Sequence, residues 1–207
     1  MKNLKYGTLL ALVLIASIRS LQAGSPPTRI TSSQAITVPG NYLLVNDITV
    51  PINGIGIHIQ ASDVTLNLNG HTINASQGNG IVIDYQFDAG LSPVINARVS
   101  NGRIVAAGSG VAISGSECLI TGLNITTNFI GFNIDHGQFN RVQNCVLTGQ
   151  QARTPFSLFL TSHNTIQNCT LAGTFLDTIE EQDQAGAAYT VIGNNTFSGI
   201  QWASPTL

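Results

Sequence analysis

The sequence predicts an all-β solenoid, a chain wound into a stack of short strands, and three observations lead to this prediction. A short motif recurs along most of the chain at nearly regular intervals. Charged residues make up only 9% of the sequence, where an ordinary globular protein has about 25%. No long segment has the apolar period of an amphipathic helix. Gly, Asn, Thr and Ser supply the polarity instead, which favours many short strands joined by tight turns.

The first residues have the features of a secretion signal. Lys2 and Lys5 precede an apolar stretch at residues 7–18, and Ala23 offers a small residue at a cleavage point. Arg19 ends the apolar stretch below the roughly 18 to 20 residues that a membrane-spanning helix needs. We therefore expect export and cleavage rather than membrane anchoring.

The predicted organisation is a cleaved signal peptide at residues 1–23 and one domain at residues 24–207. Removal of the signal peptide leaves five arginines, no lysine and ten acidic residues, a net charge of −5. A mildly acidic protein without lysine is a poor match for phosphate backbones, so we expect no nucleic-acid partner. The expected location is secreted, periplasmic or cell-surface, with no membrane span in the mature chain.

The recurring motif consists of an apolar residue, any residue, Asn or Gly, two further residues and a second apolar residue. Its six copies begin at Leu68, Val99, Ile120, Val142, Ile166 and Ile192. Successive copies are 21 to 31 residues apart, a spacing typical of one turn of a solenoid. We expect the first residues from Val99 to Ile192 to form one inward stack. The last residues should form a second stack, which comprises Ile104, Ile125, Leu147, Leu171 and Phe197.

A second element recurs between these copies and has the pattern of a short strand entered through glycine. Its clear copies are Gly56-Ile57-His58-Ile59, Gly80-Ile81-Val82-Ile83, Gly110-Val111-Ala112-Ile113 and Gly131-Phe132-Asn133-Ile134. Two strand types in a constant order predict a single-stranded right-handed parallel β-helix of about six to seven coils, with rungs about 4.8 Å apart. The alternative is a β-sandwich with Asn-rich hairpins, but hairpins do not require this repeat.

The third position of the motif marks a corner of the coil. Asparagine tolerates the left-handed backbone that a tight corner needs, and its amide can bond the equivalent amide of the next rung. The position is occupied by Asn101, Asn144, Asn168 and Asn194, with Gly70 and Gly122 in the other copies.

The opening of the repeat region carries a resemblance to a known family. The residues concerned are Val38-Pro39-Gly40-Asn41-Tyr42-Leu43-Leu44, Gly56-Ile57-His58-Ile59 and Asp63-Val64-Thr65-Leu66-Asn67-Leu68-Asn69-Gly70-His71-Thr72-Ile73. This segment resembles the start of bacterial right-handed parallel β-helix repeat proteins of the pectin-lyase-like fold, and the likeness extends over residues 36–200. The resemblance implies a fold rather than a function, because the family mixes lyases, hydrolases, epimerases, adhesins and members without known activity.

Two classes of function follow. The first is a non-catalytic module that binds a polysaccharide or a cell-surface protein, which the polar rows and the shortage of catalytic residue types favour. The alternative is a polysaccharide-active enzyme, a pectate-lyase-like lyase rather than a glycoside hydrolase, for which no carboxylate pair is evident. A carboxylate and an arginine on one outward face, two rungs apart or less, would favour the enzyme.

Four residues are candidates for catalysis: His71, Arg103, Asp135 and His136. His71 lies one rung from Arg103 if the Asn-Gly pairs are aligned, but it takes the position of Cys145 if the motifs are aligned, so its orientation is open. Asp135 and His136 form the closest fragment to the hydrolase motifs that the resemblance implies. The resemblance also allows an arginine base, for which the candidates are Arg98, Arg103, Arg141 and Arg153. We expect Arg103 and Arg141 on successive rungs.

Acidic residues in the two longest intervals are candidate Ca²⁺ ligands: Asp84, Asp88, Glu180, Glu181 and Asp183. Insertions in solenoids emerge on one face and often carry binding. These acids lack the alternating spacing of a dedicated calcium loop. We therefore expect no cofactor, with Ca²⁺ as the only candidate.

Two further expectations concern the cysteines and the ends of the solenoid. Cys145 and Cys169 share a motif position on adjacent rungs, where parallel side chains make poor disulfide geometry, so we expect buried free thiols. Open solenoid ends expose strand edges and apolar side chains. We expect residues 28–39 to cover one end, and Trp202 and Leu207 to fold back over the other. An end that is left open would favour self-association.

Overall fold

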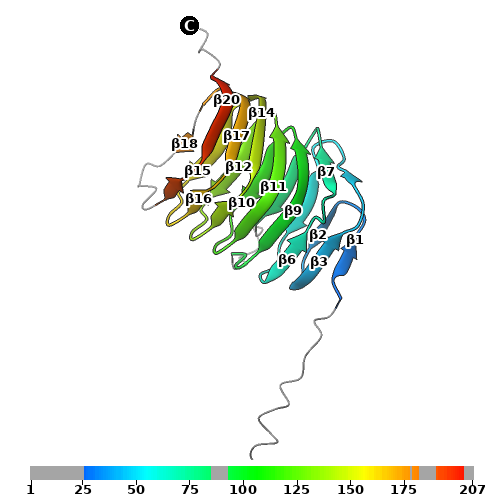
Figure 1. Ribbon diagram of the computed structural model, residues 1–207. Coiled ribbons are helices and arrows are strands. Elements are labelled where there is room, and N and C mark those ends of the chain that lie inside the picture. Colours follow the sequence, from blue (N-terminus) through cyan, green and yellow to red (C-terminus); the bar gives the residue numbers. More distant parts are fainter. Residues whose placement is uncertain (1–25, 85–92, 178, 182–189, 203–207) are drawn as a thin grey trace, which may run out of the picture.

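The chain forms a parallel β-solenoid of about six turns, as the sequence predicts (Figure 1). The computed structural model describes residues 26–84, 93–177, 179–181 and 190–202. All regular elements within these residues are β-strands, and the paired strands run parallel. No helix in this part of the chain is long and apolar enough to cross a lipid bilayer.

Each turn has up to three strand segments, which we call faces 1, 2 and 3 in chain order. Face 1 contains β1 (Thr28–Ile30), β3 (Gly40–Leu44), β6 (Val64–Asn67), β13 (Arg141–Gln143), β16 (Thr165–Gln167) and β19 (Val191–Gly193). Face 2 contains β4 (Ile48–Thr49), β7 (Thr72–Ala75), β14 (Val146–Ala152), β17 (Thr170–Phe175) and β20 (Thr196–Trp202). β9 (Arg98–Ala106) and β11 (Leu119–Thr127) run across the corner from face 1 to face 2.

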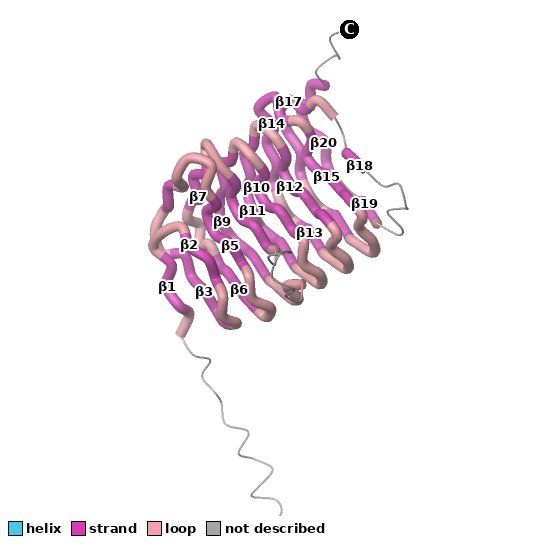
Figure 2. The backbone as a smooth tube through the Cα atoms, turned by 180° about the vertical axis from the view of Figure 1, so that it is seen from behind, coloured by secondary structure: helices cyan, strands magenta, loops and turns pink. Residues whose placement is uncertain are grey.

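Face 3 is a separate sheet that closes the coil (Figure 2). Its strands are β2 (Gln34–Ile36), β5 (Ile55–Ile59), β8 (Asn79–Ile83), β10 (Ser109–Ile113), β12 (Ile130–Asp135), β15 (Thr154–Phe159) and β18 (Ile179–Glu181). Ile, Val, Leu and Phe fill its inward positions, where Phe132 and Phe156 stack with parallel rings on neighbouring rungs. These residues pack between the faces as one continuous apolar core.

The two predicted inward stacks exist. Val99, Ile120, Val142, Ile166 and Ile192 pair in register, as do Ile104, Ile125, Leu147, Leu171 and Phe197. All of them are buried except the two in the last turn, where Ile192 is 36% and Phe197 is 55% exposed. The prediction is therefore wrong for this turn, because no described strand pairs with the outer edge of β19 or β20.

The asparagine corner has the predicted backbone. Asn101, Asn144 and Asn168 have φ of 60°, 55° and 55°, and Gly122 takes the same left-handed conformation. In the first copy, however, Leu66 rather than Leu68 pairs with Val99, so this turn has a corner two residues longer. The motif alone gave the wrong alignment for this turn, because Leu68 fits its pattern and Leu66 does not.

A second corner, between faces 3 and 1, also has a left-handed residue, on five successive rungs. Its residues are Asp63, Asn96, Glu117, Phe139 and His163, with φ between 56° and 60°. The next residue in each case is buried: Val64, Ala97, Cys118, Asn140 and Asn164. Asn140 links three rungs through hydrogen bonds. Its side chain accepts at Oδ1 from the Cys118 N–H (2.9 Å) and donates from Nδ2 to the Gly115 carbonyl (3.0 Å). Its backbone N–H donates to Asn164 Oδ1 (2.8 Å). These buried amides bridge the rungs of this corner.

The remaining predictions concerned the cysteines and the two ends of the solenoid. Cys145 and Cys169 are buried free thiols on neighbouring rungs, as predicted. Residues 28–36 add the strands β1 and β2 to the stack instead of crossing its opening, so the predicted cover is wrong in form. Trp202 ends β20 in register with Phe175 and does not fold back. Leu207 lies outside the described residues.

Candidate functional site

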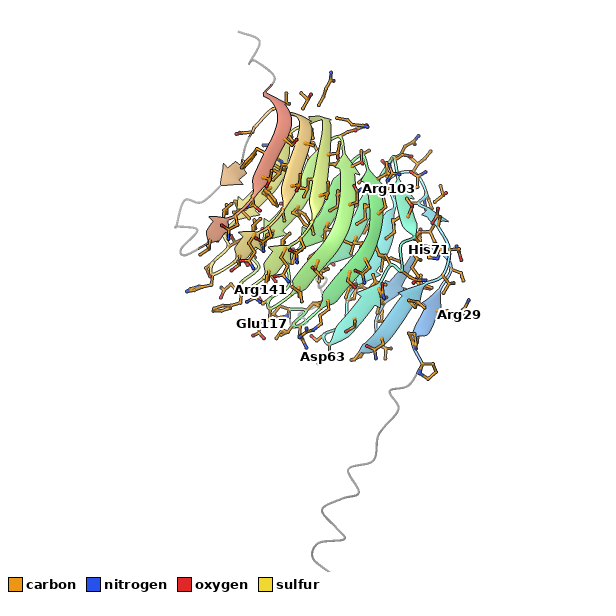
Figure 3. The ribbon with its side chains drawn as sticks, in the orientation of Figure 1. Arg29, Asp63, His71, Arg103, Glu117 and Arg141 are labelled. Atoms are coloured by element: carbon orange, nitrogen blue, oxygen red, sulfur yellow. The ribbon has the colours of Figure 1, made fainter. Side chains whose placement is uncertain are left out.

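Chemistry-bearing side chains gather in two places on the outside of the larger sheet (Figure 3). Arg98, Glu117 and Arg141 lie where the corner from face 3 enters face 1. His71 and Arg103 lie at the corner between faces 1 and 2, on another part of the surface. The first group surrounds a hollow, which makes it the better candidate for a binding site.

The hollow is built on one outward column of face 1. Arg98, Leu119 and Arg141 are the first residues of β9, β11 and β13, and they pair in register. The residue after each of them points into the core, so strand alternation directs these three side chains outward. Because Leu119 separates the two arginines by two rungs, their Cα atoms lie about 10 Å apart.

This hollow, which we call the arginine hollow, has a volume of about 220 Å³. Its lining residues are Arg98, Glu117, Cys118, Leu119, Phe139 and Arg141. Both arginines, Glu117 and Phe139 are exposed, and Cys118 is buried beneath them. The hollow is shallow, with Cys118 and Leu119 as its apolar floor and with two guanidinium groups and an aromatic ring at its rim.

The rim residues Glu117 and Phe139 are held in the left-handed conformation, which is unfavourable for bulky side chains. The corner keeps them there through bonds between rungs. The Glu117 N–H donates to the Gln138 carbonyl (2.9 Å), and the Phe139 N–H donates to the Ser162 carbonyl (3.2 Å). The Phe139 ring is 55% exposed and stacks on His163 with a centroid distance of 4.8 Å. Backbone geometry thus displays these side chains at the surface.

The electrostatics of the arginine hollow favour an anion. Two guanidinium groups face a single carboxylate, that of Glu117. Within the described residues, neither guanidinium group takes part in an ion pair or a side-chain hydrogen bond. Burial raises the pKa of Cys118 to about 11, which favours the neutral thiol at physiological pH.

The second group combines Asp47, His71 and Arg103. Asp47 Oδ1 accepts from the Thr72 N–H (2.9 Å) and lies 3.2 Å from His71 Nδ1. The backbone hydrogen bond from Thr72, and then that from His71, lower the pKa of Asp47. Asp47 precedes Ile48, which pairs with Ile73, and Thr72 pairs with Arg103. Asp47 and Arg103 are therefore two rungs apart on one outward column.

The orientation of His71, open from the sequence, is outward. The longer corner of its turn places Leu68 in the inward position, where it is fully buried. On the next rung Gly102 leaves room for it, since a Cβ there would lie 2.3 Å from Leu68 Cβ. His71 is left at the surface, about one third exposed and directed to Asp47.

Asp135 and His136 do not join either group, because they lie at the end of β12 on face 3. His136 Nδ1 is 2.5 Å from Asp135 Oδ1, and the His136 ring packs edge-on against Phe159. Asp84 follows β8 on the same face and forms an ion pair with His58 Nε2. These are separate histidine–carboxylate pairs of face 3.

The Ca²⁺ candidates are not brought together in the described part of the chain. Asp84 pairs with His58, while Glu180 and Glu181 lie on β18 in register with Ser157 and Leu158. Asp88 and Asp183 lie outside the described residues. Among the residues that are described, no three His, Cys, Asp or Glu side chains are close enough to share a metal ion.

Two results differ from the sequence interpretation of the arginines. Arg103 and Arg141 do not lie on successive rungs, because Arg103 belongs to face 2 and Arg141 to face 1, two rungs further along. Arg141 is instead the partner of Arg98 across the arginine hollow. Arg153 lies with its guanidinium carbon 5.8 Å from the Phe129 ring centroid.

Sequence reasoning missed Glu117 and Phe139, although a signal for them exists. Each stands three residues before the first apolar residue of its motif copy, as do Asn96 and His163. Extension of the motif by three residues toward the N-terminus would have revealed the corner and its variable side chain.

Comparisons with known proteins identify no relative. No model of a protein family matches the chain. Searches of the curated proteins and of the solved structures likewise return no match.

Proposed function

We propose that the chain is a non-catalytic binding module for an acidic polysaccharide, and that the arginine hollow is its binding site. One observation carries the proposal: Arg98 and Arg141 project from one outward column, two rungs apart, on either side of Leu119. Neither guanidinium group has an acidic partner within the described residues, so both are available to a ligand.

The residue types suit a uronate, a sugar that bears a carboxylate. A guanidinium group binds a carboxylate through two parallel charge-assisted hydrogen bonds. The exposed ring of Phe139 offers an apolar surface to the C–H face of a sugar. Glu117 can accept hydrogen bonds from sugar hydroxyls.

The spacing of the arginines favours a polymer over a single sugar. Two carboxylates must lie about 10 Å apart to occupy both guanidinium groups at once. A ligand that engages both sites gains from effective concentration, and a monomer cannot. We therefore expect affinity to rise sharply with the length of the oligosaccharide and to fall with added salt.

The family, the handedness of the coil and the location of the protein are part of the same proposal. The resemblance at residues 38–73 supports membership of the bacterial pectin-lyase-like β-helix proteins. Parallel strands joined by crossovers are right-handed in nearly all sheets, which supports right-handed winding. The features of residues 1–23 support export to the periplasm, the cell surface or the medium.

The test is titration of the mature chain with galacturonate oligomers of one to six sugars. We expect Arg98→Gln and Arg141→Gln each to weaken binding of the longer oligomers by about tenfold to a hundredfold. Arg29→Gln is the matched control, because Arg29 is an exposed arginine on β1 of the same face and lies outside the hollow. An equal loss in the control would refute the assignment, since general charge would then explain binding.

A second candidate function, a polysaccharide lyase, is favoured by the Asp47–His71–Arg103 group. Asp47 and Arg103 lie two rungs apart on one outward column, which is the arrangement that the sequence led us to expect of an enzyme. Arg103 would bind the uronate carboxylate, and His71, oriented by Asp47, would take the proton from the adjacent carbon. The electron pair of that C–H bond would form the C=C bond as the C–O bond to the glycosidic oxygen breaks, and a water molecule would give that oxygen its proton. Ultraviolet absorbance of unsaturated product, lost in His71→Gln, is the expected sign of this activity, and its absence from the wild type excludes it.

A further inference from the structure

A second, larger hollow lies at the corner between faces 2 and 3, in the first turns of the solenoid. It has a volume of about 490 Å³ and is lined by Ile52, Asn53, Ser76, Gln77, Gly78, Asn79, Ala107 and Gly108. We call it the amide hollow, because three of these residues carry a side-chain amide. None of its lining residues carries a charge.

The hollow arises because successive corners shorten. Residues 50–54 join β4 to β5, residues 76–78 join β7 to β8, and only residues 107–108 join β9 to β10. The shortest corner consists of Ala107 and Gly108, which leave the space open. In the next turn Phe129 stands beside Gly108 in register and is 41% exposed. The two longer corners and the shortest one thus line the hollow.

Several backbone N–H groups of these corners are already paired. The N–H groups of Asn53, Asn79 and Gly108 donate to the carbonyls of Gln77 (2.7 Å), Gly54 (3.0 Å) and Gly78 (3.0 Å). The corner cannot take another strand through its main chain, because these donors are occupied. A ligand must therefore be recognised by side chains.

The side chains of the amide hollow are available to a ligand. Within the described residues, no hydrogen bond engages the side chains of Asn53, Ser76 or Gln77. Asn79 is fixed in place, because its Oδ1 accepts from the Ser109 N–H (2.8 Å), and this leaves its NH₂ group to donate. Ile52, which is 72% exposed, adds an apolar surface beside these polar groups.

We infer that the amide hollow binds a neutral saccharide. Amides and hydroxyls can both donate and accept, which suits ligands rich in hydroxyl groups. An anion would find no cation here, and a peptide would find neither free backbone nor deep apolar pockets for its side chains. The inference goes beyond the proposed function, because this hollow shares no residue with the arginine hollow.

The experiment uses the ¹⁵N-labelled mature chain and four neutral probes: cellotetraose, xylotetraose, mannotetraose and chitotetraose. We expect at least one of them, at millimolar concentration, to shift the amide signals of Gly54, Gly78 and Gly108. Asn53→Gly with Gln77→Ala should weaken that binding by about tenfold. Glycine keeps the left-handed backbone of Asn53 (φ 57°), so this variant should retain its fold.

The control is Asn101→Gly with Gln150→Ala, which makes the same changes at an exposed left-handed corner and an exposed strand position elsewhere. It should bind as the wild type does. The inference is overturned if none of the four probes shifts these signals, or if the control loses as much affinity. Arg98→Gln with Arg141→Gln should leave neutral binding unchanged, so failure at one hollow is distinguishable from failure at the other.

Discussion

Two neighbouring columns of face 1 follow opposite rules. The inward column, Val99, Ile120, Val142 and Ile166, contains only β-branched apolar residues, and all four are fully buried. The outward column one residue earlier contains Arg98, Leu119, Arg141 and Thr165. The first column must satisfy the same packing on every rung, whereas the second has no such requirement. The repeated inward residues therefore indicate the fold. The outward residues that vary from rung to rung are where we look for function.

The corner between faces 3 and 1 shows the same contrast. The left-handed backbone recurs on five rungs, but its exposed side chains change from Asp63 to Glu117 to His163. The residue after each of them is buried. On two rungs this residue is an asparagine, Asn140 or Asn164, and its side chain forms a hydrogen bond with a neighbouring rung. A corner thus fixes a backbone direction and leaves the projecting side chain free to vary.

The strongest test of this contrast is Ile120→Asp in the inward column. An unpaired carboxylate in the core, together with the lost apolar contacts, should cost more than about 4 kcal/mol and unfold the domain. Circular dichroism and thermal melts measure this. Leu119→Asp, one residue earlier in the outward column, should leave the fold intact. Similar melting curves for the two variants would contradict the account.

A smaller loss is expected from Asn140→Ala. The change removes the partners of the Cys118 N–H and the Gly115 carbonyl, both inside the corner. Each unsatisfied buried group costs about 1 to 3 kcal/mol, so the free energy of unfolding should fall by several kcal/mol. Asn144→Gly, at the exposed corner, should be nearly neutral because glycine adopts its φ of 55°. Chemical denaturation compares them, and a larger effect at Asn144 would be the contrary result.

Features that recur from rung to rung were predicted from the sequence, whereas features of single rungs were missed. The inward columns and the left-handed asparagines were predicted because packing and backbone geometry impose them on successive turns. The register of Leu66 was missed because Leu68 fits the motif, and only the coil shows which of them is in line with Val99. The expected neighbour of Arg141 was also wrong. Arg103 was expected on the adjacent rung, but the corner within β9 places Arg98 on face 1 and Arg103 on face 2. The spacing of the motif does not show this corner.

The cysteines give a kinetic test of the buried columns. Burial raises the pKa of Cys118 to about 11, and the hydrogen bond with Cys169, followed by burial, raises the pKa of Cys145. A raised pKa means that the stability from the neutral thiol is present below the ordinary value of 9.0 and is lost as the pH rises toward about 11. At pH 8, iodoacetamide should modify Cys118 and Cys145 only after unfolding. Rapid modification of the native protein, followed by mass spectrometry, would show that they are accessible.

The smallest expected effect concerns Asp47 on the outer surface. The hydrogen bond from Thr72 lowers its pKa from 3.8, so the contact stabilises the fold above that pH and loses its effect as the pH falls through the lowered pKa. Because Asp47 is exposed, solvent screens the interaction. Asp47→Asn should melt slightly below the wild type at pH 6, and the gap should narrow at pH 3. A gap that widens on acidification would contradict the assigned contact.

The most direct test of the central claim measures fold and binding in one protein, Arg98→Gln with Arg141→Gln. Both arginines occupy the outward column, so we expect them to serve the proposed binding and not the packing of the core. The melting temperature should equal that of the wild type, while affinity for hexagalacturonate should fall by about a hundredfold or more. A variant that binds hexagalacturonate as tightly as the wild type, or that loses its fold, would contradict the division between inward structure and outward function.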